Sequence, residues 1–445
     1  MSGVVPIPEL EEDSLPEIYF DPPDKYWTRD RKGKWFKRGS GDIKLLLKDK
    51  GVIEAKGREY LSPLEKILLN TQEENNIQYA GPLAGYAEGL HTFQGKRILV
   101  TSGPQLVEPK KGEWPLLEGI FDMMLGHDAV QLQHFYAWLS LSMIHLYDRI
   151  NNSNGSPVFF PGQALALVGE QGAAKSLTQS VITVLLGGRC ARPFQAMTGN
   201  TNHNGDLFEA EHLCIEDESP STDLRTRRKL GAGIKMATAN GSQRCRAMYK
   251  EAIELNPFWR MTLSVNSDPE HLLVLPPLDV SLADKIMFLK CQKHPMPMAA
   301  GTPAEKKVFW EALLDEVPAF AHSLLNEFLV PNSIKEDRFG VRHYHHPEIL
   351  HELSMLSPEQ RLLELVDMEI FKSDAAGSVT LRSLDLEKLL AGPDSACERE
   401  ARRLFTHTNN TTIGNYLSKL SSSRPDRVEK GPLKNGYQHW MLNPP

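Results

Sequence analysis

Apolar residues along the chain fall into short runs and into helical spacings, and each pattern predicts a different element. An apolar run at 165–168 stops at Gly169, which predicts a short buried strand. Residues 177–186 continue with helical spacing and end at two glycines. Further apolar strands are expected at 211–218 and 258–266. We therefore expect an α/β fold for this central part of the chain.

The segment before these strands has a different pattern. Residues 1–23 are acidic and rich in proline without periodicity, which predicts a flexible arm. Hairpins are expected around Lys32-Gly33 and around Gln94-Gly95, with a short helix at 43–47 between them. The first hairpin carries several basic residues, but a solvated turn explains them better than a nucleic-acid contact.

Apolar residues recur at helical spacing between 115 and 150, and Gly126 divides them into two helices. The stretch 135–150 is the most apolar long segment, but His145 and Asp148 interrupt it. It therefore predicts a buried helix and no membrane span. We expect residues 24–156 to form an α+β and helical module.

The pattern after the apolar strands indicates two helices and then a new domain. One helix is expected at 304–314, and a second begins only after Pro318, because proline interrupts a helix. Residues 336–356 are expected to be a linker. From residue 357 the order of elements is that of a winged-helix domain. Its expected helices are 359–371, 384–390 and 411–420, and its expected strands are 379–381, 428–430 and 437–442.

Composition narrows the class of protein. The 445 residues fit two or three domains, and 24% charged with 41% hydrophobic residues is typical of soluble globular chains. A net charge of −7 gives no overall attraction for polyanions, so a nucleic-acid contact has to be local. The five scattered cysteines form no CxxC pair, which argues against disulfides and zinc and favours a reducing, cytoplasmic location. No secretory signal is evident.

The chemistry of the chain is expected at its first apolar strand. A strand, a loop with glycines, a Lys-Ser pair and a helix follow one another in the order of a phosphate-binding P-loop. Small residues let backbone N–H groups approach a phosphate, Lys175 would reach the β- and γ-phosphates of ATP, and Ser176 would bind Mg²⁺. Ala174 stands where the usual pattern has glycine. The nucleotide-binding residues expected are Gly169, Gln171, Gly172, Ala173, Ala174, Lys175, Ser176 and Leu177.

Two later strands end in residues that suit ATP hydrolysis. The strand at 211–218 ends in acids, and in a P-loop fold the strand beside the phosphate loop ends in an acid that organises Mg²⁺. Asp217 fits that role and Glu218 fits the group that polarises the attacking water, although Glu216 leaves the register open by one residue. Asn266, at the end of the next strand, is placed to hold this water. The expected catalytic residues are thus Lys175, Asp217, Glu218 and Asn266.

Basic residues gather in two places although the chain as a whole is acidic. Residues 243–255 alternate and predict a hairpin around Lys250 that also carries Arg244 and Arg246. The C-terminal domain carries a second basic group from residue 402 onward, including Lys419 and Arg424. Both groups suit contacts with nucleic-acid phosphates, with a winged helix used only for protein packing as the alternative.

This ordered set resembles the superfamily 3 branch of AAA+ ATPases, the group of phage and plasmid primase-helicases. The matching pieces lie in residues 160–290 and include Gly169–Ser176, Cys214–Glu218 and Ser264–Asn266. The resemblance implies an AAA+ core at 157–335 and a homo-oligomeric ring, a hexamer, that hydrolyses ATP between subunits. It also implies movement on single-stranded or forked DNA, with Lys250 similar to the lysine that grips the DNA backbone.

Family members supply an arginine to the neighbouring subunit's ATP, and the resemblance offers Lys285 or Arg260 for that part. Because the residues before the P-loop show no spaced carboxylate pair, we expect no priming activity. Two other functions stay open. One is a DNA-binding AAA+ switch, in regulation or defence, that does not unwind. The other is a small-molecule kinase, against which the Asn266 strand and the missing substrate lid both count.

Overall fold

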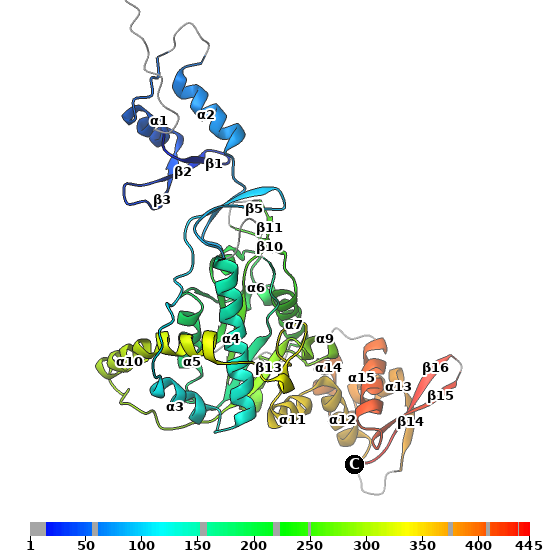
Figure 1. Ribbon diagram of the computed structural model, residues 1–445. Coiled ribbons are helices and arrows are strands. Elements are labelled where there is room, and N and C mark those ends of the chain that lie inside the picture. Colours follow the sequence, from blue (N-terminus) through cyan, green and yellow to red (C-terminus); the bar gives the residue numbers. More distant parts are fainter. Residues whose placement is uncertain are drawn as a thin grey trace, which may run out of the picture. The chain divides into compact units, whose positions relative to one another are not determined.

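The computed structural model describes residues 15–55, 61–151, 158–216, 223–247, 251–372, 377–405, 410–434 and 436–445, the side chains of residues 410 and 411 excepted (Figure 1). Two compact units form: Met1–Asn266 with Asp279–Tyr344, and Ser267–Leu278 with His345–Pro445. Across the described ranges, none of the helices combines the length and the apolar character needed to cross a bilayer.

The chain begins with a small antiparallel sheet covered by two helices. Ile18 and Tyr26 of the sheet pack with Ile43 and Leu64 of the helices. The arm expected at 1–23 is therefore wrong at its end, because burial of Ile18 and pairing with the next strand make residues 18–21 a strand. The elements are β1 (Ile18–Asp21), β2 (Lys25–Arg29), β3 (Trp35–Gly39), α1 (Ser40–Asp49) and α2 (Pro63–Glu74).

A second small sheet follows, and the expected hairpin at Gln94-Gly95 is confirmed. Both turn residues have positive φ angles, 50° and 75°, which is the turn geometry that suits the twist of two antiparallel strands. The strands are β4 (Tyr79–Gly81), β5 (Gly89–Phe93) and β6 (Lys96–Val100), in the order β4-β6-β5.

Two helices divided near Gly126 are also confirmed: α3 (Pro115–Met124) and α4 (Ala129–Asn151). The first backbone N–H groups of α3, at Leu116 and Leu117, donate to the two carboxylate oxygens of Glu316 at 3.0 and 2.9 Å. A helix leaves these N–H groups without partners of its own, so the carboxylate from a distant helix acts as the cap. As expected, α4 buries its apolar side chains in the main core.

A five-stranded parallel sheet is the centre of the first unit. Its order is β13-β7-β12-β9-β8, and every pair of neighbours is parallel. The fully buried residues of β7 and β12 show why the sequence reads as unbroken apolar runs there. The strands are β7 (Ala164–Gly169), β8 (Cys190–Ala191), β9 (His212–Glu216), β12 (Arg260–Val265) and β13 (Ile286–Cys291).

The helices of this unit include one that the sequence divided wrongly. α10 runs from Pro303 to His322 with Pro318 inside it. Proline costs an internal helix about 3 kcal/mol, but here Phe320, two residues further along, is fully buried against Trp114 and Phe121. Tertiary burial of this face keeps the helix continuous. The other helices are α5 (Lys175–Leu185), α6 (Phe194–Thr198), α7 (Leu224–Ala239) and α9 (Val280–Ala283).

The linker expected at 336–356 is wrong, because the two units share this stretch. Phe339 and Val341 are buried, and the Phe288 N–H donates to the Tyr344 carbonyl at 2.8 Å, so this half belongs to the first unit. Residues Pro347–Met355 instead form helix α11 of the second unit, burying Ile349 and Leu353.

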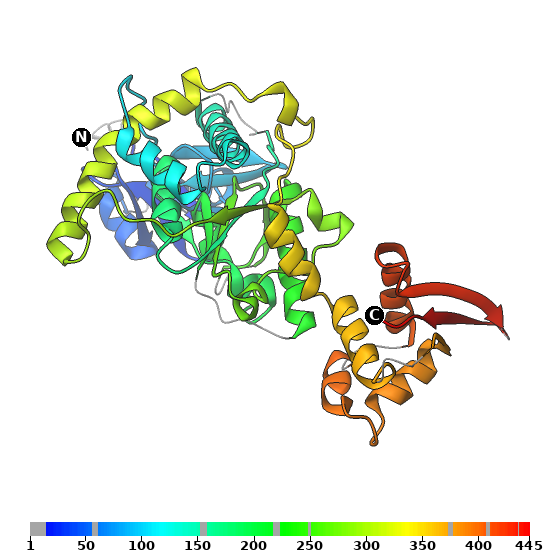
Figure 2. The same ribbon diagram turned by 90° about the horizontal axis from the view of Figure 1, so that it is seen from below.

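The second unit confirms the predicted elements after residue 357 and adds one helix. Its sheet has the order β14-β16-β15, and β15 and β16 project as a two-stranded ribbon in Figures 1 and 2. The predicted set omitted α14, a short helix with the charged sequence EREARRLF. The elements are α8 (Pro269–Leu272), α12 (Pro358–Glu369), β14 (Val379–Arg382), α13 (Ser383–Ala391), α14 (Glu398–Phe405), α15 (Asn410–Ser423), β15 (Val428–Lys434) and β16 (Tyr437–Leu442).

Candidate active site

The predicted phosphate loop joins the carboxyl end of β7 to the start of α5. Gly169 closes β7 against β13, and a Cβ there would lie 2.0 Å from the Cys291 carbonyl oxygen, so only glycine fits. Gly172 and Ala174 both have left-handed backbone conformations, with φ angles of 86° and 57°. Ala174 therefore adopts the conformation for which the usual pattern uses glycine, and the loop turns as a P-loop requires.

Lys175 lies at the centre of the loop. Its ammonium donates to the carbonyl oxygens of Gly169 and Glu170, both at 2.7 Å, and to Oδ1 of Asn266 at 3.1 Å. The residue is only 6% exposed, whereas Ser176 beside it is exposed at the first turn of α5. The structure thus brings together two predicted catalytic residues that are far apart in sequence.

Three strand ends lie at one level of the sheet. In the register, Val265 pairs with Val168, and Ser264 pairs with both Leu167 and Glu216. Since all three strands are parallel, the residues that follow them meet at one edge. Glu216 is half-buried and its carboxylate accepts from Arg192 at 3.1 Å. Asp217 and Glu218 lie outside the described residues.

The order of the strands differs from the expectation in one respect. The acidic strand was expected beside the P-loop strand, but β12 lies between β7 and β9. The prediction is wrong because strands that follow one another in sequence need not be neighbours in a parallel sheet. As a result the residue after the neighbouring strand, Asn266, contacts Lys175 of the loop.

A chain of buried polar groups lies under the site and was missed by sequence reasoning. The Gln179 amide of α5 donates to Thr262 Oγ1 at 2.7 Å, and His212 Nε2 lies 2.8 Å from the same hydroxyl. His212 Nδ1 lies 2.7 Å from Thr183 Oγ1. Burial lowers the pKa of His212 to about 3, so this imidazole is neutral at physiological pH. The signal in the sequence was polar residues within apolar strands.

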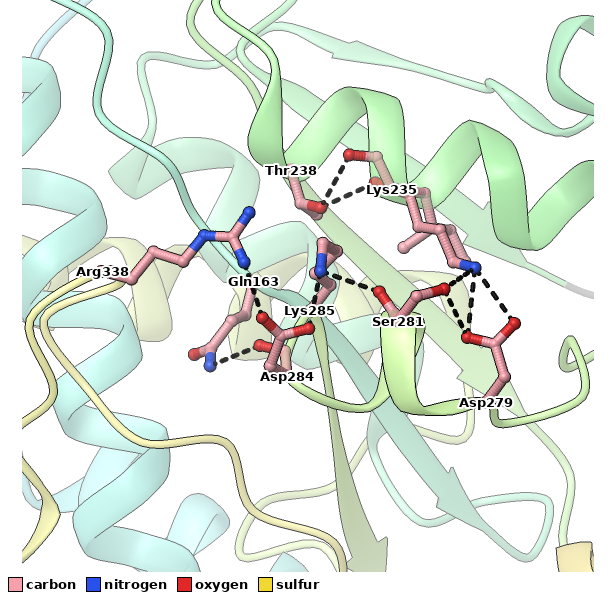
Figure 3. Close-up of polar contacts among 9 residues, drawn as sticks. Gln163, Lys235, Thr238, Asp279, Ser281, Asp284, Lys285 and Arg338 are labelled. Atoms are coloured by element: carbon pink, nitrogen blue, oxygen red, sulfur yellow. Dashed lines mark hydrogen bonds and ion pairs between the residues drawn. The ribbon is translucent and has the colours of Figure 1, made fainter.

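A second polar cluster surrounds Asp284, just before β13 (Figure 3). Its carboxylate accepts from Lys285 at 2.6 Å and from Arg338 at 2.8 Å, and Lys285 also donates to the Ser281 carbonyl at 2.7 Å. Burial acts to raise the pKa of Asp284, but the hydrogen bond and charge of Lys285 outweigh it and lower the pKa.

This cluster lies at the amino ends of the parallel strands, whereas the phosphate loop lies at their carboxyl ends. It precedes the first residue of β13, Ile286, which pairs with Ala164 at the start of β7, whereas the loop follows the end of β7. Lys285 is mostly covered, with 12% of its side chain exposed, and Arg338 is the more accessible cation at 47%. Sequence reasoning named Lys285 but missed Arg338, which is distant in sequence.

Arg260 does not suit the predicted role of a cation supplied to the ATP of a neighbouring subunit. The residue is 3% exposed, and its guanidinium donates to the Phe160 carbonyl and contacts His145 Nδ1 at 3.1 Å. Burial lowers the pKa of Arg260 to about 9. A side chain held inside its own subunit has no reach toward a neighbour, so we withdraw Arg260 as a trans-acting residue.

The predicted basic hairpin forms from β10 (Gln243–Cys245) and β11 (Ile253–Leu255), which pair antiparallel. Arg244 and Arg246 are exposed, and Lys250 lies outside the described residues. Asn204 holds the base of the hairpin, because its side chain donates to the Arg244 carbonyl at 3.0 Å and accepts from the Arg246 N–H at 2.7 Å. The hairpin is thus tied to the segment between β8 and β9.

The C-terminal basic residues are mostly ion-paired. Lys419 on α15 lies 2.6 Å from Glu359 on α12, and Arg424 lies 3.0 Å from Asp426. Exposed pairs of this kind contribute about 0–1 kcal/mol. Neither pair prevents a phosphate from competing for the cation.

Comparison with known proteins places the fold. No protein-family model matches the chain, and no curated protein matches it. The apo structure of the NrS-1 C-terminal region is 13% identical with a TM-score of 0.53, covering 98% of this chain and 100% of that chain. Its A-form apo structure is 12% identical, with a TM-score of 0.51 and 96% coverage of both chains.

These likenesses show the fold alone. The chain is a mixed α/β protein with a parallel central sheet and a P-loop-like strand, loop and helix, and it shares its fold end to end with the NrS-1 C-terminal region. A structure of JCV helicase also matches, at 11% identity over 55% of this chain and 68% of that one, but its TM-score of 0.25 carries no argument.

Proposed function

We propose that the chain is an ATP-dependent DNA helicase or translocase of the superfamily 3 AAA+ type. The observation that carries this proposal is the contact between Lys175 and Asn266 at the edge where β7, β12 and β9 end together. An ATP hydrolase needs a phosphate-binding lysine and a water-positioning polar group at one place, and a simple nucleotide-binding loop needs only the first.

The residues at the loop fit an ATP–Mg²⁺ complex. The first turn of α5 presents backbone N–H groups and the exposed Ser176 hydroxyl, and the loop has the left-handed turns that let its backbone approach a phosphate. When bound, Mg²⁺ supplies charge to the phosphates. In this proposal Ser176 and Asp217 hold the metal ion, Lys175 holds the phosphates, and Glu218 with Asn266 orients the attacking water.

The proposal places DNA at the β10–β11 hairpin. Arg244 and Arg246 are exposed there, and Lys250, which lies between the two strands in sequence, would complete a set of three cations for the phosphate backbone. Asn204 holds the base of this hairpin by two hydrogen bonds to the segment before β9. The second unit, proposed to be a winged helix, would add Lys419 and Arg424.

The proposal also needs a cation from a neighbouring subunit of a homo-oligomeric ring, taken here to be a hexamer. Arg338 and Lys285 are the candidates, because both lie around Asp284 at the edge of the sheet away from their own loop. Arg338 is the stronger of the two, since a guanidinium matches phosphate oxygens and its side chain is accessible.

A set of two variants tests the function. Lys175→Ala is expected to abolish ATP hydrolysis, and Lys250→Ala to keep basal hydrolysis while losing its stimulation by single-stranded DNA. Strand displacement on forked DNA separates the helicase from a DNA-binding ATPase switch: hydrolysis and DNA binding without unwinding on any fork favours the switch. Phosphoryl transfer to a small molecule instead of water would favour a kinase.

A further inference from the structure

Two cysteines that are distant in sequence meet at the edge of the central sheet. Cys190 lies on β8 and Cys214 on β9, and their sulfur atoms are 2.8 Å apart. Cys190 pairs with His212 across the two parallel strands. Side chains alternate along a strand, so Cys214 lies on the same face as His212 and one step nearer the carboxyl end. The two thiols therefore face each other across neighbouring strands.

The two thiols differ in access. Cys190, on the edge strand, is exposed, whereas Cys214 is 3% exposed. The hydrogen bond between the two thiols lowers the pKa of Cys190, and burial only partly opposes it. The same hydrogen bond, together with burial, raises the pKa of Cys214. Cys190 thus has the features of an attacking thiolate, and Cys214 those of a resolving thiol beside it.

His212 is close to the pair, and its geometry decides between a metal site and a thiol pair. Cys214 Sγ lies 3.3 Å from Nδ1 and 3.5 Å from Nε2 of the ring. A sulfur nearly equidistant from both nitrogens lies over the ring and not along either lone pair. The two ring nitrogens instead make their hydrogen bonds with the hydroxyls of Thr183 and Thr262, one nitrogen as donor and the other as acceptor. A metal ion between the sulfurs would lack the imidazole as a ligand.

We propose that Cys190 and Cys214 form a reversible disulfide when the protein is exposed to hydrogen peroxide. The Cys190 thiolate attacks one peroxide oxygen, the O–O bond breaks, and the departing hydroxide takes a proton to become water. This leaves a sulfenic acid on Cys190. The Cys214 sulfur then attacks the Cys190 sulfur, the S–O bond breaks and a second water leaves. Two thiols and one hydrogen peroxide give a disulfide and two waters, so the sulfurs lose the two electrons that the peroxide gains.

The disulfide would join the two ends of a segment that also contacts the β10–β11 hairpin. The residues between Cys190 and Cys214 include Asn204, which holds the base of the β10–β11 hairpin. Oxidation would tie the two-residue strand β8 to β9 and fix both ends of this segment. The disulfide itself depends only on the two strands and is independent of the proposed helicase activity.

Thiol mapping of the full chain tests the proposal. The protein is treated with hydrogen peroxide, denatured with N-ethylmaleimide, digested and analysed by mass spectrometry, with Cys190→Ser, Cys214→Ser and Cys397→Ser in parallel. We expect the number of free thiols to fall from five to three, with a cross-linked peptide that joins residues 190 and 214 and disappears with dithiothreitol. The Cys397→Ser protein should still form it. In Cys214→Ser a dimedone adduct should accumulate at Cys190.

Three results would overturn the proposal. One is alkylation of Cys190 and Cys214 after peroxide treatment to the same extent as the buried Cys397. Another is stoichiometric zinc in the purified protein that either serine variant removes, since the pair would then be a metal site. A third is oxidation of Cys190 alone in the wild-type chain. Loss of ATP hydrolysis by Lys175→Ala does not bear on any of these results.

Discussion

The ammonium of Lys175 lies 3.1 Å from the side-chain oxygen of Asn266, so a residue of the phosphate loop and a residue at the end of β12 share one hydrogen bond. β12 is the direct neighbour of β7, and its last residue, Val265, pairs with Val168 of β7. The contact therefore depends on the register of two buried strands, which places Asn266 beside the phosphate loop that carries Lys175.

Replacement of Asn266 separates phosphate binding from hydrolysis. We expect Asn266→Ala to lower kcat for ATP hydrolysis by on the order of 10²-fold, as loss of one well-placed polar group in a catalytic site does. Nucleotide affinity should change by less than about tenfold, because Lys175 keeps its hydrogen bonds to the carbonyl oxygens of Gly169 and Glu170. Phosphate release measures kcat, and binding of a non-hydrolysed ATP analogue measures nucleotide affinity. Asn326→Ala, at an exposed position, is the control and should leave both unchanged.

Ala174 tests the backbone of the loop. Its φ of 57° places an L-residue in the left-handed region. Ala174→Gly should relieve about 1–2 kcal/mol of backbone strain in the folded protein. Two effects oppose this gain: the greater chain entropy of glycine in the unfolded state, about 0.5–1 kcal/mol, and the loss of a buried methyl group. We expect its unfolding free energy in urea to stay within about 1 kcal/mol of wild type, and its nucleotide affinity within about threefold.

The contrasting variant is Ala174→Val, which should lower the unfolding free energy by about 2–3 kcal/mol, since a β-branched residue is not tolerated at positive φ and the position is 7% exposed. A tenfold gain in affinity on Ala174→Gly would show instead that alanine holds the loop away from the phosphates.

The parts of the fold that local patterns specify were predictable. The apolar run before Gly169 predicts β7, and the alternation at 243–255 predicts the β10–β11 hairpin, because each depends on residues close in sequence. The order of the sheet was not predictable in this way. Which strand lies beside β7 depends on how the connecting segments cross, and β12 took the place expected for the acidic strand.

Pairs of distant residues account for the remaining differences. Pro318 signals a break, yet burial of Phe320 keeps α10 continuous. The spacing of Cys190 and Cys214 matches no motif, yet neighbouring parallel strands bring their sulfurs together. Arg338 lies far from Asp284 in sequence and pairs with it in space. None of these relationships leaves a periodic signal in the chain.

His212 predicts how stability depends on pH. Its pKa is about 3 in the folded protein and, in an unfolded chain, near the ordinary value of 6.5, so the unfolded state binds more protons between these values. Stability is therefore full above about pH 6.5 and falls as the pH drops toward about 3. His212 should account for about 2 kcal/mol of the loss between pH 7.5 and pH 5.

Urea unfolding of wild type and His212→Gln at the two pH values measures this share. The variant keeps a polar group for Thr183 and Thr262 and should lose about 2 kcal/mol less between the two pH values than wild type does. His351→Gln, at an exposed position in the second unit, should behave as wild type. Equal losses in wild type and His212→Gln would show that His212 is not the group that titrates.

Arg338 provides the test of catalysis between subunits. We expect Arg338→Ala to lower kcat for ATP hydrolysis by at least about 10³-fold while analogue binding is kept, as loss of a trans-acting arginine does. The fold should not suffer, because the exposed pair with Asp284 is worth at most about 1 kcal/mol. Arg342→Ala, an exposed arginine in the same segment, is the matched control and should retain activity.

Mixing shows whether Arg338 acts across the interface. Lys175→Ala subunits keep Arg338, and Arg338→Ala subunits keep the phosphate loop, so each inactive protein carries what the other lacks. An equal mixture that exchanges subunits should recover activity at roughly a quarter of the interfaces of a head-to-tail ring. A mixture as inactive as its two components would place the role of Arg338 within its own subunit. Recovery in mixtures with Lys285→Ala but not with Arg338→Ala would assign the trans-acting cation to Lys285.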